Sequence, residues 1–118
     1  MTKNDFIETI NYSGGESKFY SLKKVSEKFS FDLDLMPYSL RILLENLVRN
    51  YDEKIVDESL IKKFIFNKKD KFEIPFRPSR VVLQDFTGVP CVADLAAMRD
   101  IINKLGKDTS SINPLVPV

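Results

Sequence analysis

The chain has 118 residues, of which 43% are hydrophobic and 30% charged, a balance typical of one globular domain that excludes a disordered chain. Its 18 basic and 17 acidic residues leave a net charge of +1, so the chain as a whole has no strong field to attract nucleic acid. No apolar run approaches the roughly 20 residues that cross a bilayer, and the N-terminus lacks an apolar stretch behind a basic head. We therefore predict a cytoplasmic protein that makes no contact with a membrane.

The cysteine count limits the chemistry that this chain can supply by itself. Cys91 is the only cysteine, and there is no histidine. A single thiol excludes an internal disulfide, which agrees with a reducing compartment. It also excludes a metal cluster held by several cysteines of this chain.

The N-terminal segment is polar and contains Ser13-Gly14-Gly15, which favours a flexible hinge. We expect a loosely held arm over residues 1–17 and a folded region over residues 18–118. Apolar residues at 19–22 indicate a short strand, and residues 22–29 have the composition of one or two helical turns.

An amphipathic helix is the clearest predicted element. It begins at Pro37, because the fixed φ of proline suits a first helical turn, and it continues to Tyr51. Apolar residues recur at the spacing of one helix face, at Leu40, Leu43, Leu44, Leu47, Val48 and Tyr51. Arg41, Glu45 and Arg49 lie four apart on another face, where each pair adds only about 0.2–0.5 kcal/mol. This charged row indicates a solvated face rather than a binding site.

A second, shorter helix is predicted over residues 57–66, with Asp57 as its N-cap. Its inner side carries Leu60, Ile61, Phe64 and Ile65. A charged turn follows over residues 67–71. Pro75 and Pro78 then predict an extended stretch, because each proline disfavours helix for itself and for the preceding residue.

The last part of the chain has the order strand, turn, helix. Val81-Val82-Leu83 is predicted to be a buried strand, and residues 85–88 are predicted to form a turn. A helix is predicted over residues 89–105, with Pro90 in its first turn and Gly106 beyond its end. This order predicts an α/β unit, in which ligands commonly bind beyond the carboxyl end of a strand.

Gln84 and Asp85 stand at that carboxyl end, where two regular elements would hold their backbone in place. A glutamine amide is neutral across physiological pH and offers two donors, so it can bind a carboxylate or hydroxyl without titrating. The alternative is that both residues only cap the turn and satisfy backbone groups.

Four blocks of sequence carry a resemblance to a known family. They are MPYSLRILLENLVRN at 36–50, LQDFTGVP at 83–90, ADLAAMRD at 93–100 and INPLVPV at 112–118. In this order they resemble the aconitase A-type aconitate hydratases, and the similarity extends from about Phe19 to the last residue. The resemblance implies that residues 18–118 form the N-terminal part of the first aconitase α/β/α domain, with helices around a short sheet. Because the apolar tail at 112–118 has nothing yet to cover it, we expect a truncated piece of a larger parent protein.

The family resemblance also implies a function for that parent. Such enzymes isomerise citrate and isocitrate through cis-aconitate in the tricarboxylic acid cycle, and a [4Fe–4S] cluster held by three cysteines acts as a Lewis acid. By resemblance, Gln84 binds substrate, whereas the catalytic residues and the cluster ligands lie outside this chain. The chain alone is then expected to be inactive, to bind no cluster, and to belong to a monomeric parent. Two alternatives stay open: a 2-methylcitrate dehydratase of the same superfamily, and an RNA-binding regulator of the iron regulatory protein type.

Three further features are assigned structural roles. Cys91 stands where relatives commonly have alanine, so we expect a packed residue rather than a cluster ligand or a reactive thiol. For Arg77 and Arg80, pairing with nearby aspartates (Asp85, Asp94 or Asp100) is favoured over binding of an anionic ligand. A cluster of lysines comprises Lys62, Lys63, Lys68, Lys69 and Lys71. Acidic residues interrupt this cluster and no stacking aromatics are interleaved, so it indicates a solvated face rather than an RNA site.

Overall fold

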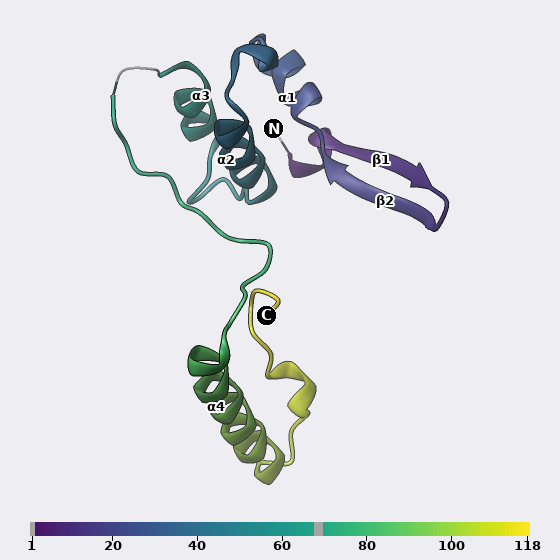
Figure 1. Cartoon of the computed structure of the whole chain (residues 1–118), viewed down its shortest axis with the longest axis vertical. Coiled ribbons are helices and arrows are strands. Elements are labelled where there is room, and N and C mark those ends of the chain that lie inside the picture. The colour runs from purple at the N-terminus through teal and green to yellow at the C-terminus, as the bar shows by residue number, and fades with distance from the viewer. Residues whose placement is uncertain (1, 68–69) are drawn as a thin grey trace. The chain divides into compact units, whose positions relative to one another are not determined.

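The fold consists of two compact units, Met1–Arg77 and Pro78–Val118, seen in a computed structural model that describes residues 2–67 and 70–118 (Figure 1). The predicted α/β class is confirmed, since the described residues contain helices together with a short antiparallel sheet. Among them, no helix is both long and apolar enough to cross a membrane.

A β-hairpin stands near the N-terminus of the first unit. Strands β1 (Ile7–Tyr12) and β2 (Gly15–Tyr20) pair antiparallel, with Ile7 opposite Tyr20 and Tyr12 opposite Gly15 (Figure 1). The Ser13-Gly14 dipeptide, predicted as part of a hinge, is instead the two-residue hairpin loop, and Gly15 beside it has φ of +136°. The expected boundary after residue 17 falls inside β2, whereas the flexibility of residues 1–17 stays a prediction.

The described residues of the first unit continue with three α-helices, α1 (Leu22–Phe29), α2 (Tyr38–Arg49) and α3 (Glu58–Phe66), and a short 3-10 helix (Leu33–Leu35) lies between α1 and α2. The predicted start of α2 at Pro37 is confirmed, because Pro37 occupies its N-cap. The predicted cap of α3 is confirmed too, since Asp57 Oδ1 accepts a hydrogen bond of 2.8 Å from the Leu60 N–H.

The hydrophobic core of the first unit lies between these helices and the segment before the hairpin. Its buried residues are Phe6, Val25, Phe29, Leu44, Leu47, Val48, Tyr51, Val56, Ile61 and Ile65. The predicted apolar stripe of α2 therefore enters the core along its C-terminal part, whereas Leu40 near its start remains 40% exposed. The charged row of α2 lies at least partly in solvent, with an ion pair of 3.1 Å between Arg49 and Glu45.

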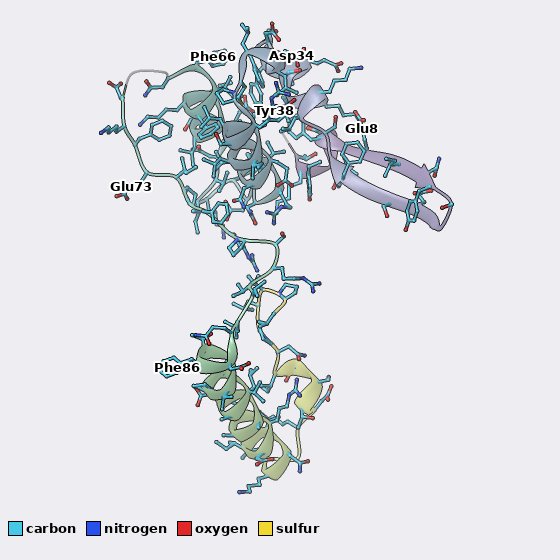
Figure 2. All side chains as sticks on the ribbon, in the orientation of Figure 1. Glu8, Asp34, Tyr38, Phe66, Glu73 and Phe86 are labelled. Atoms are coloured by element: carbon cyan, nitrogen blue, oxygen red, sulfur yellow. The ribbon has the colours of Figure 1, made fainter. Side chains whose placement is uncertain are left out.

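The second unit is built on a single long helix, α4 (Asp85–Lys104). No residue of Pro78–Val118 is buried, and Phe86 projects outward from the first turn with 83% of its surface exposed (Figure 2). The tail is held against α4 by Arg99, whose guanidinium donates to the Ile112 carbonyl at 2.9 and 3.1 Å and to Asn113 Oδ1 at 2.7 Å. A pairing across thirteen positions has no local sequence signal, and Arg99 was not predicted to have a role.

Two predictions for the second unit are wrong. Residues 81–83 form no strand, because the Val81 N–H finds only the Pro117 carbonyl at 2.9 Å, and Val82 is 90% exposed. A strand needs a neighbouring strand to pair with, and the described residues place none beside this segment. The helix begins at Asp85 rather than at residue 89, so the expected turn at 85–88 is its first turn and Pro90 lies within it. Its predicted end is confirmed, since Leu105 is the C-cap and Gly106 follows with φ of +69°.

Candidate functional site

Gln84 occupies the N-cap of α4 and is exposed to solvent. Its side-chain oxygen Oε1 accepts the Phe86 N–H at 2.8 Å, and its backbone carbonyl accepts the Gly88 N–H at 2.7 Å. The bond to Oε1 satisfies a donor of the first helical turn that would otherwise lack a partner within the helix, whereas the bond from Gly88 is the first regular backbone bond of α4. Gln84 therefore caps α4, as the alternative reading of the sequence expected, and the cap uses only the oxygen of its side-chain amide.

The amide nitrogen of Gln84 stands apart from this capping interaction. Nε2 donates no hydrogen bond within residues 2–67 and 70–118, so both of its N–H groups are available to solvent or to a ligand. Because the cap holds Oε1 on the helix, the group that the side chain presents outward is a pair of donors. Such a pair suits an acceptor such as a carboxylate oxygen.

An open depression of about 460 Å³ lies beside Gln84 in the second unit. Its lining residues are Leu83, Gln84, Asp85, Gly88, Val89, Val92, Ala93 and Ala96. The predicted neighbours Gln84 and Asp85 thus border one cavity, but most of its wall is apolar and Asp85 adds a negative charge. This wall by itself offers an anion one amide and no positive charge.

Within the described residues, Arg80 lacks the predicted ion pair, whereas the backbone of Arg77 is held by a side chain of the first unit. None of the ion pairs found in the described part of the chain joins Arg80 to Asp85, Asp94 or Asp100. Arg77 belongs to the first unit, where its backbone is bound by the side chain of Asn46. That contact joins positions 31 residues apart, and no pattern in the sequence signals it.

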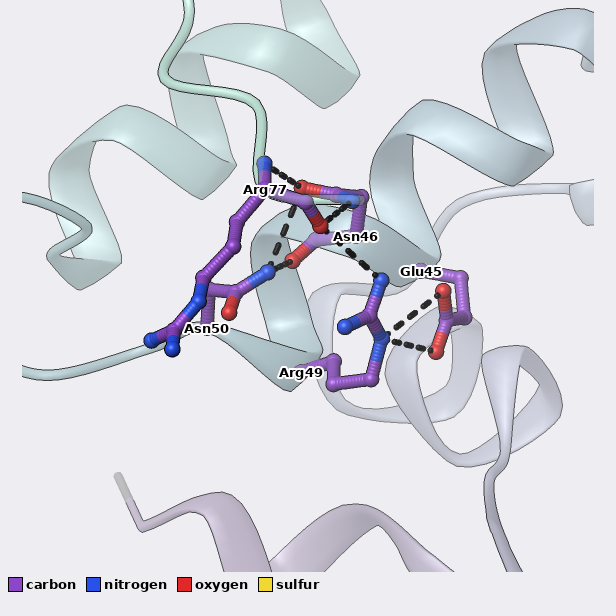
Figure 3. A network of polar contacts seen from close by, with 5 residues as sticks. All are labelled: Glu45, Asn46, Arg49, Asn50 and Arg77. Atoms are coloured by element: carbon purple, nitrogen blue, oxygen red, sulfur yellow. Dashed lines mark hydrogen bonds and ion pairs between the residues drawn. The ribbon is translucent and has the colours of Figure 1, made fainter. Parts of the chain in front are cut away.

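A polar network surrounds this Asn46–Arg77 contact (Figure 3). Asn46 is 3% exposed; its Nδ2 donates to the Arg77 carbonyl at 2.7 Å, and its Oδ1 accepts the Arg77 N–H at 3.2 Å. Arg49 Nη2 also donates to the Arg77 carbonyl at 3.3 Å, and Asn50 Nδ2 donates to Asn46 Oδ1 at 3.3 Å. The network therefore fixes the backbone of Arg77 from two positions on α2.

Cys91 and the lysine cluster are the remaining candidates. Cys91 is half-buried on α4 rather than packed in a core, and the described residues contain no group of three or more His, Cys, Asp or Glu side chains that could hold a metal ion. Of the lysine cluster, Lys62 pairs with Glu58 at 2.7 Å and Lys63 lies 4.6 Å from the centre of the Phe72 ring. Lys68 and Lys69 lie outside the described residues.

Comparison with known proteins places these features in a family. The profile of the aconitase family (aconitate hydratase) matches residues 53–118. Aconitate hydratase A of Rickettsia bellii is 40% identical over 118 residues, covering 100% of this chain and 13% of the relative. The enzymes of that name from Bradyrhizobium diazoefficiens and Legionella pneumophila are 48% and 46% identical, covering 94% and 92% of this chain and 13% of each relative.

This chain thus spans about 13% of the length of the curated relatives that it matches. The profile match includes the Gln84 cap, the whole of α4 and the apolar tail. Because the match covers more than half of its residues, the chain belongs to the aconitase family.

Proposed function

We propose that this chain supplies the N-terminal part of an aconitate hydratase that interconverts citrate and isocitrate through cis-aconitate in the tricarboxylic acid cycle. Within that enzyme, Gln84 binds the substrate. Membership in the aconitase family and relatives that carry the name aconitate hydratase A support the activity. The observation that best supports the role of Gln84 is its exposed amide nitrogen, which has no partner among the described residues.

The chemistry of Gln84 is binding and orientation rather than proton transfer. A hydrogen bond from a neutral amide to an ionised carboxylate contributes about 1.5–3 kcal/mol, enough to orient a substrate. Neighbouring Asp85 disfavours an anion, and Gln84 cannot neutralise several carboxylates by itself. The cationic groups that balance the charge of a tricarboxylate must therefore come from residues other than those lining this depression.

The [4Fe–4S] cluster of the family does not fit the residues of this chain. Such a cluster needs several thiolate ligands, and Cys91 is the only cysteine among all 118 residues. In this proposal the cluster and its Lewis-acid chemistry belong to other parts of the enzyme. The contribution of this chain is confined to substrate binding through Gln84.

Replacement of Gln84 in the full-length enzyme tests the proposed role. Gln84→Ala should lower kcat/KM for citrate by about 10- to 150-fold, the equivalent of the lost hydrogen bond to a carboxylate. The visible absorbance of the cluster should be unchanged. If the kinetics of Gln84→Ala were unaltered, Gln84 would have a structural role only. If the full-length enzyme turned over 2-methylcitrate but not citrate, it would be a 2-methylcitrate dehydratase instead.

A matched variant separates the two interactions of the side chain. Gln84→Ser retains an oxygen that can cap α4 but loses the reach of the Nε2 donors. We expect it to be as impaired as Gln84→Ala in kinetics while recovering the stability that the alanine variant loses. Full activity in the serine variant would show that the cap alone accounts for the effect.

The isolated chain provides a second test. Residues 1–118 alone should neither hydrate cis-aconitate nor take up an iron–sulfur cluster, because one thiol cannot hold it. The measurement is cluster reconstitution followed by an assay of cis-aconitate absorbance. Turnover above a protein-free control would overturn the assignment of the catalytic machinery to other parts of the enzyme.

A further inference from the structure

Helix α4 carries apolar residues on every side. Asp94 is the only charged residue between Phe86 and Met98, a stretch of about three and a half helical turns. A helix on the surface of a globular protein normally has a polar side, as α2 has in its charged row. A helix that is apolar all round is typical of the interior of a larger protein.

The tail of the second unit covers only one side of α4. Cys91, Leu95 and Ile102 lie on the side next to Arg99, which binds the tail at the Ile112 carbonyl, and these three residues are half-buried (Figure 1). The other large apolar side chains of α4 are exposed. The contact with the tail therefore accounts for a small part of the apolar surface of this helix.

The exposed apolar residues lie on two opposite sides of α4. Val89, Val92 and Ala96 share one side, and Ile101 lies on the other side with Met98 one turn before it. Val92 and Ile101 are nine residues apart, about two and a half helical turns, so their side chains point in opposite directions from the helix axis. They are 66% and 57% exposed.

Two open depressions adjoin on the side that carries Val92. The depression beside Gln84 and a second one of about 400 Å³ share Val92 and Ala96 in their walls. Protein interiors are close-packed, and large apolar surfaces that stay open in one part of a protein commonly mark where another part packs. This side of α4 therefore has the shape and the chemistry of a packing surface.

The relatives indicate what covers the two sides. The chain spans about 13% of the aconitate hydratase A sequences that it matches, so most of each relative lies outside the matched region. A polypeptide of that length can supply separate apolar segments for two opposite sides of a helix. A second copy of this chain fits less well, because a twofold dimer uses one and the same patch on both chains and would cover one side only.

We propose that α4 is an interior helix of the full-length enzyme, and that the remainder of the same polypeptide packs against it on two opposite sides. The covering segments are apolar where they meet Val92 on one side and Ile101 on the other. This inference rests on membership in the family and not on the proposed role of Gln84. In this arrangement protein rather than substrate covers the apolar wall beside Gln84, in keeping with the lack of positive charge on that wall.

Amide hydrogen exchange compares the helix with and without the remainder of the polypeptide. Exchange over residues 91–102 should be at least about 100-fold slower in the full-length enzyme than in the 118-residue chain, because opening the helix must then also expose its covered sides. Equal exchange in the two proteins would refute the proposal. Equally slow exchange would mean that the first unit covers the helix, and equally fast exchange would mean that solvent surrounds it.

Lysine substitutions test the two sides separately. In the full-length enzyme, Val92→Lys and Ile101→Lys should each accelerate exchange over residues 91–102 at least about tenfold, because an unpaired buried charge is costly. In the 118-residue chain the same substitutions should leave exchange within about twofold, since both side chains are exposed there. If only one of the two has an effect in the full-length enzyme, α4 lies at a surface and the two-sided arrangement is wrong.

Asn103→Lys is the matched control for the lysine substitutions. It places the same charge in the last turn of α4, where the helix dipole favours a cation, so exchange should stay at the parental value. Accelerated exchange in this variant would mean that α4 tolerates no added lysine, and the assignment of covered sides would fail. If a lysine variant does not fold, Val92→Ala and Ile101→Ala take its place, with an expected acceleration of at least about fivefold.

Sedimentation velocity tests a second copy as the occupant. We expect the mass of the full-length enzyme to be the same in the parent, in Val92→Lys and in Ile101→Lys. A dimer that either substitution converts to monomers would assign that side of α4 to a second copy, contrary to the proposal. None of these measurements uses citrate, so the kinetics of Gln84→Ala decide the proposed function separately.

Discussion

The core of the first unit makes a quantitative prediction about Leu47. This side chain lies in the C-terminal part of α2 with no exposed surface, so its truncation leaves a cavity that the rigid neighbours fill only in part. Leu47→Ala should therefore lower the free energy of unfolding by about 3 kcal/mol, within the usual range of about 2–5 kcal/mol. A unit of this size has a total stability of about 4–12 kcal/mol, so the loss is a large fraction of it.

Urea unfolding followed by far-ultraviolet circular dichroism measures this loss. With a slope of about 1.5 kcal/mol per molar urea, the midpoint for Leu47→Ala should fall by about 2 M. Ile42→Ala is the control on the same helix, because Ile42 is 65% exposed and should shift the free energy by less than about 0.5 kcal/mol. Equal shifts for the two variants would refute the assignment of a core to this side of α2.

Two other predictions concern local geometry and pH. Ser30 follows α1 with φ of +54°, a left-handed conformation that glycine adopts more easily than serine. Ser30→Gly should therefore stabilise the protein by up to about 1 kcal/mol in thermal unfolding. Ser26→Gly is the control within α1, where glycine should destabilise the helix by a similar amount. A stabilised Ser26→Gly would contradict this reasoning. Backbone N–H groups that donate to Asp52 and Asp57, chiefly those of Val56 and Leu60, hold the pKa of each carboxyl below its ordinary value of 3.8. The hydrogen bonds to these two ionised carboxylates therefore stabilise the fold above about pH 3.8, and this stabilisation should be lost as the pH falls below 3.8 and the carboxylates are protonated. In acid titrations of unfolding, Asp52→Asn should weaken the dependence of stability on pH.

The helices of the first unit could be predicted because their signals are local. The period of apolar residues, the fixed φ of Pro37 and the capping ability of Asp57 act within a few positions of the chain, and the structure confirms that α2 starts after Pro37 and α3 after Asp57. The start of α4 was missed for a related reason. Its N-cap is Gln84, and glutamine is not among the residues that usually mark a helix start.

The strands depended on partners that the local sequence does not reveal. Ser13-Gly14 suits both a hinge and a hairpin loop, and only the pairing of β1 with β2 distinguishes the two. The β-branched residues Val81 and Val82 favour an extended backbone, but without a paired neighbour this segment forms no strand.

The sequence alone determined the family of this chain, the identity of Gln84 as its candidate binding residue, and the inability of one cysteine to hold a cluster. Tertiary structure brought Asn46 to Arg77 across 31 positions and Arg99 to the Ile112 carbonyl across thirteen, whereas the cap that Gln84 Oε1 makes with the Phe86 N–H is a local contact. The physical reason is the range of the interactions. Periodicity, capping preference and ligand count are properties of neighbouring residues or of composition, whereas the pairing of distant polar groups exists only after the chain has folded.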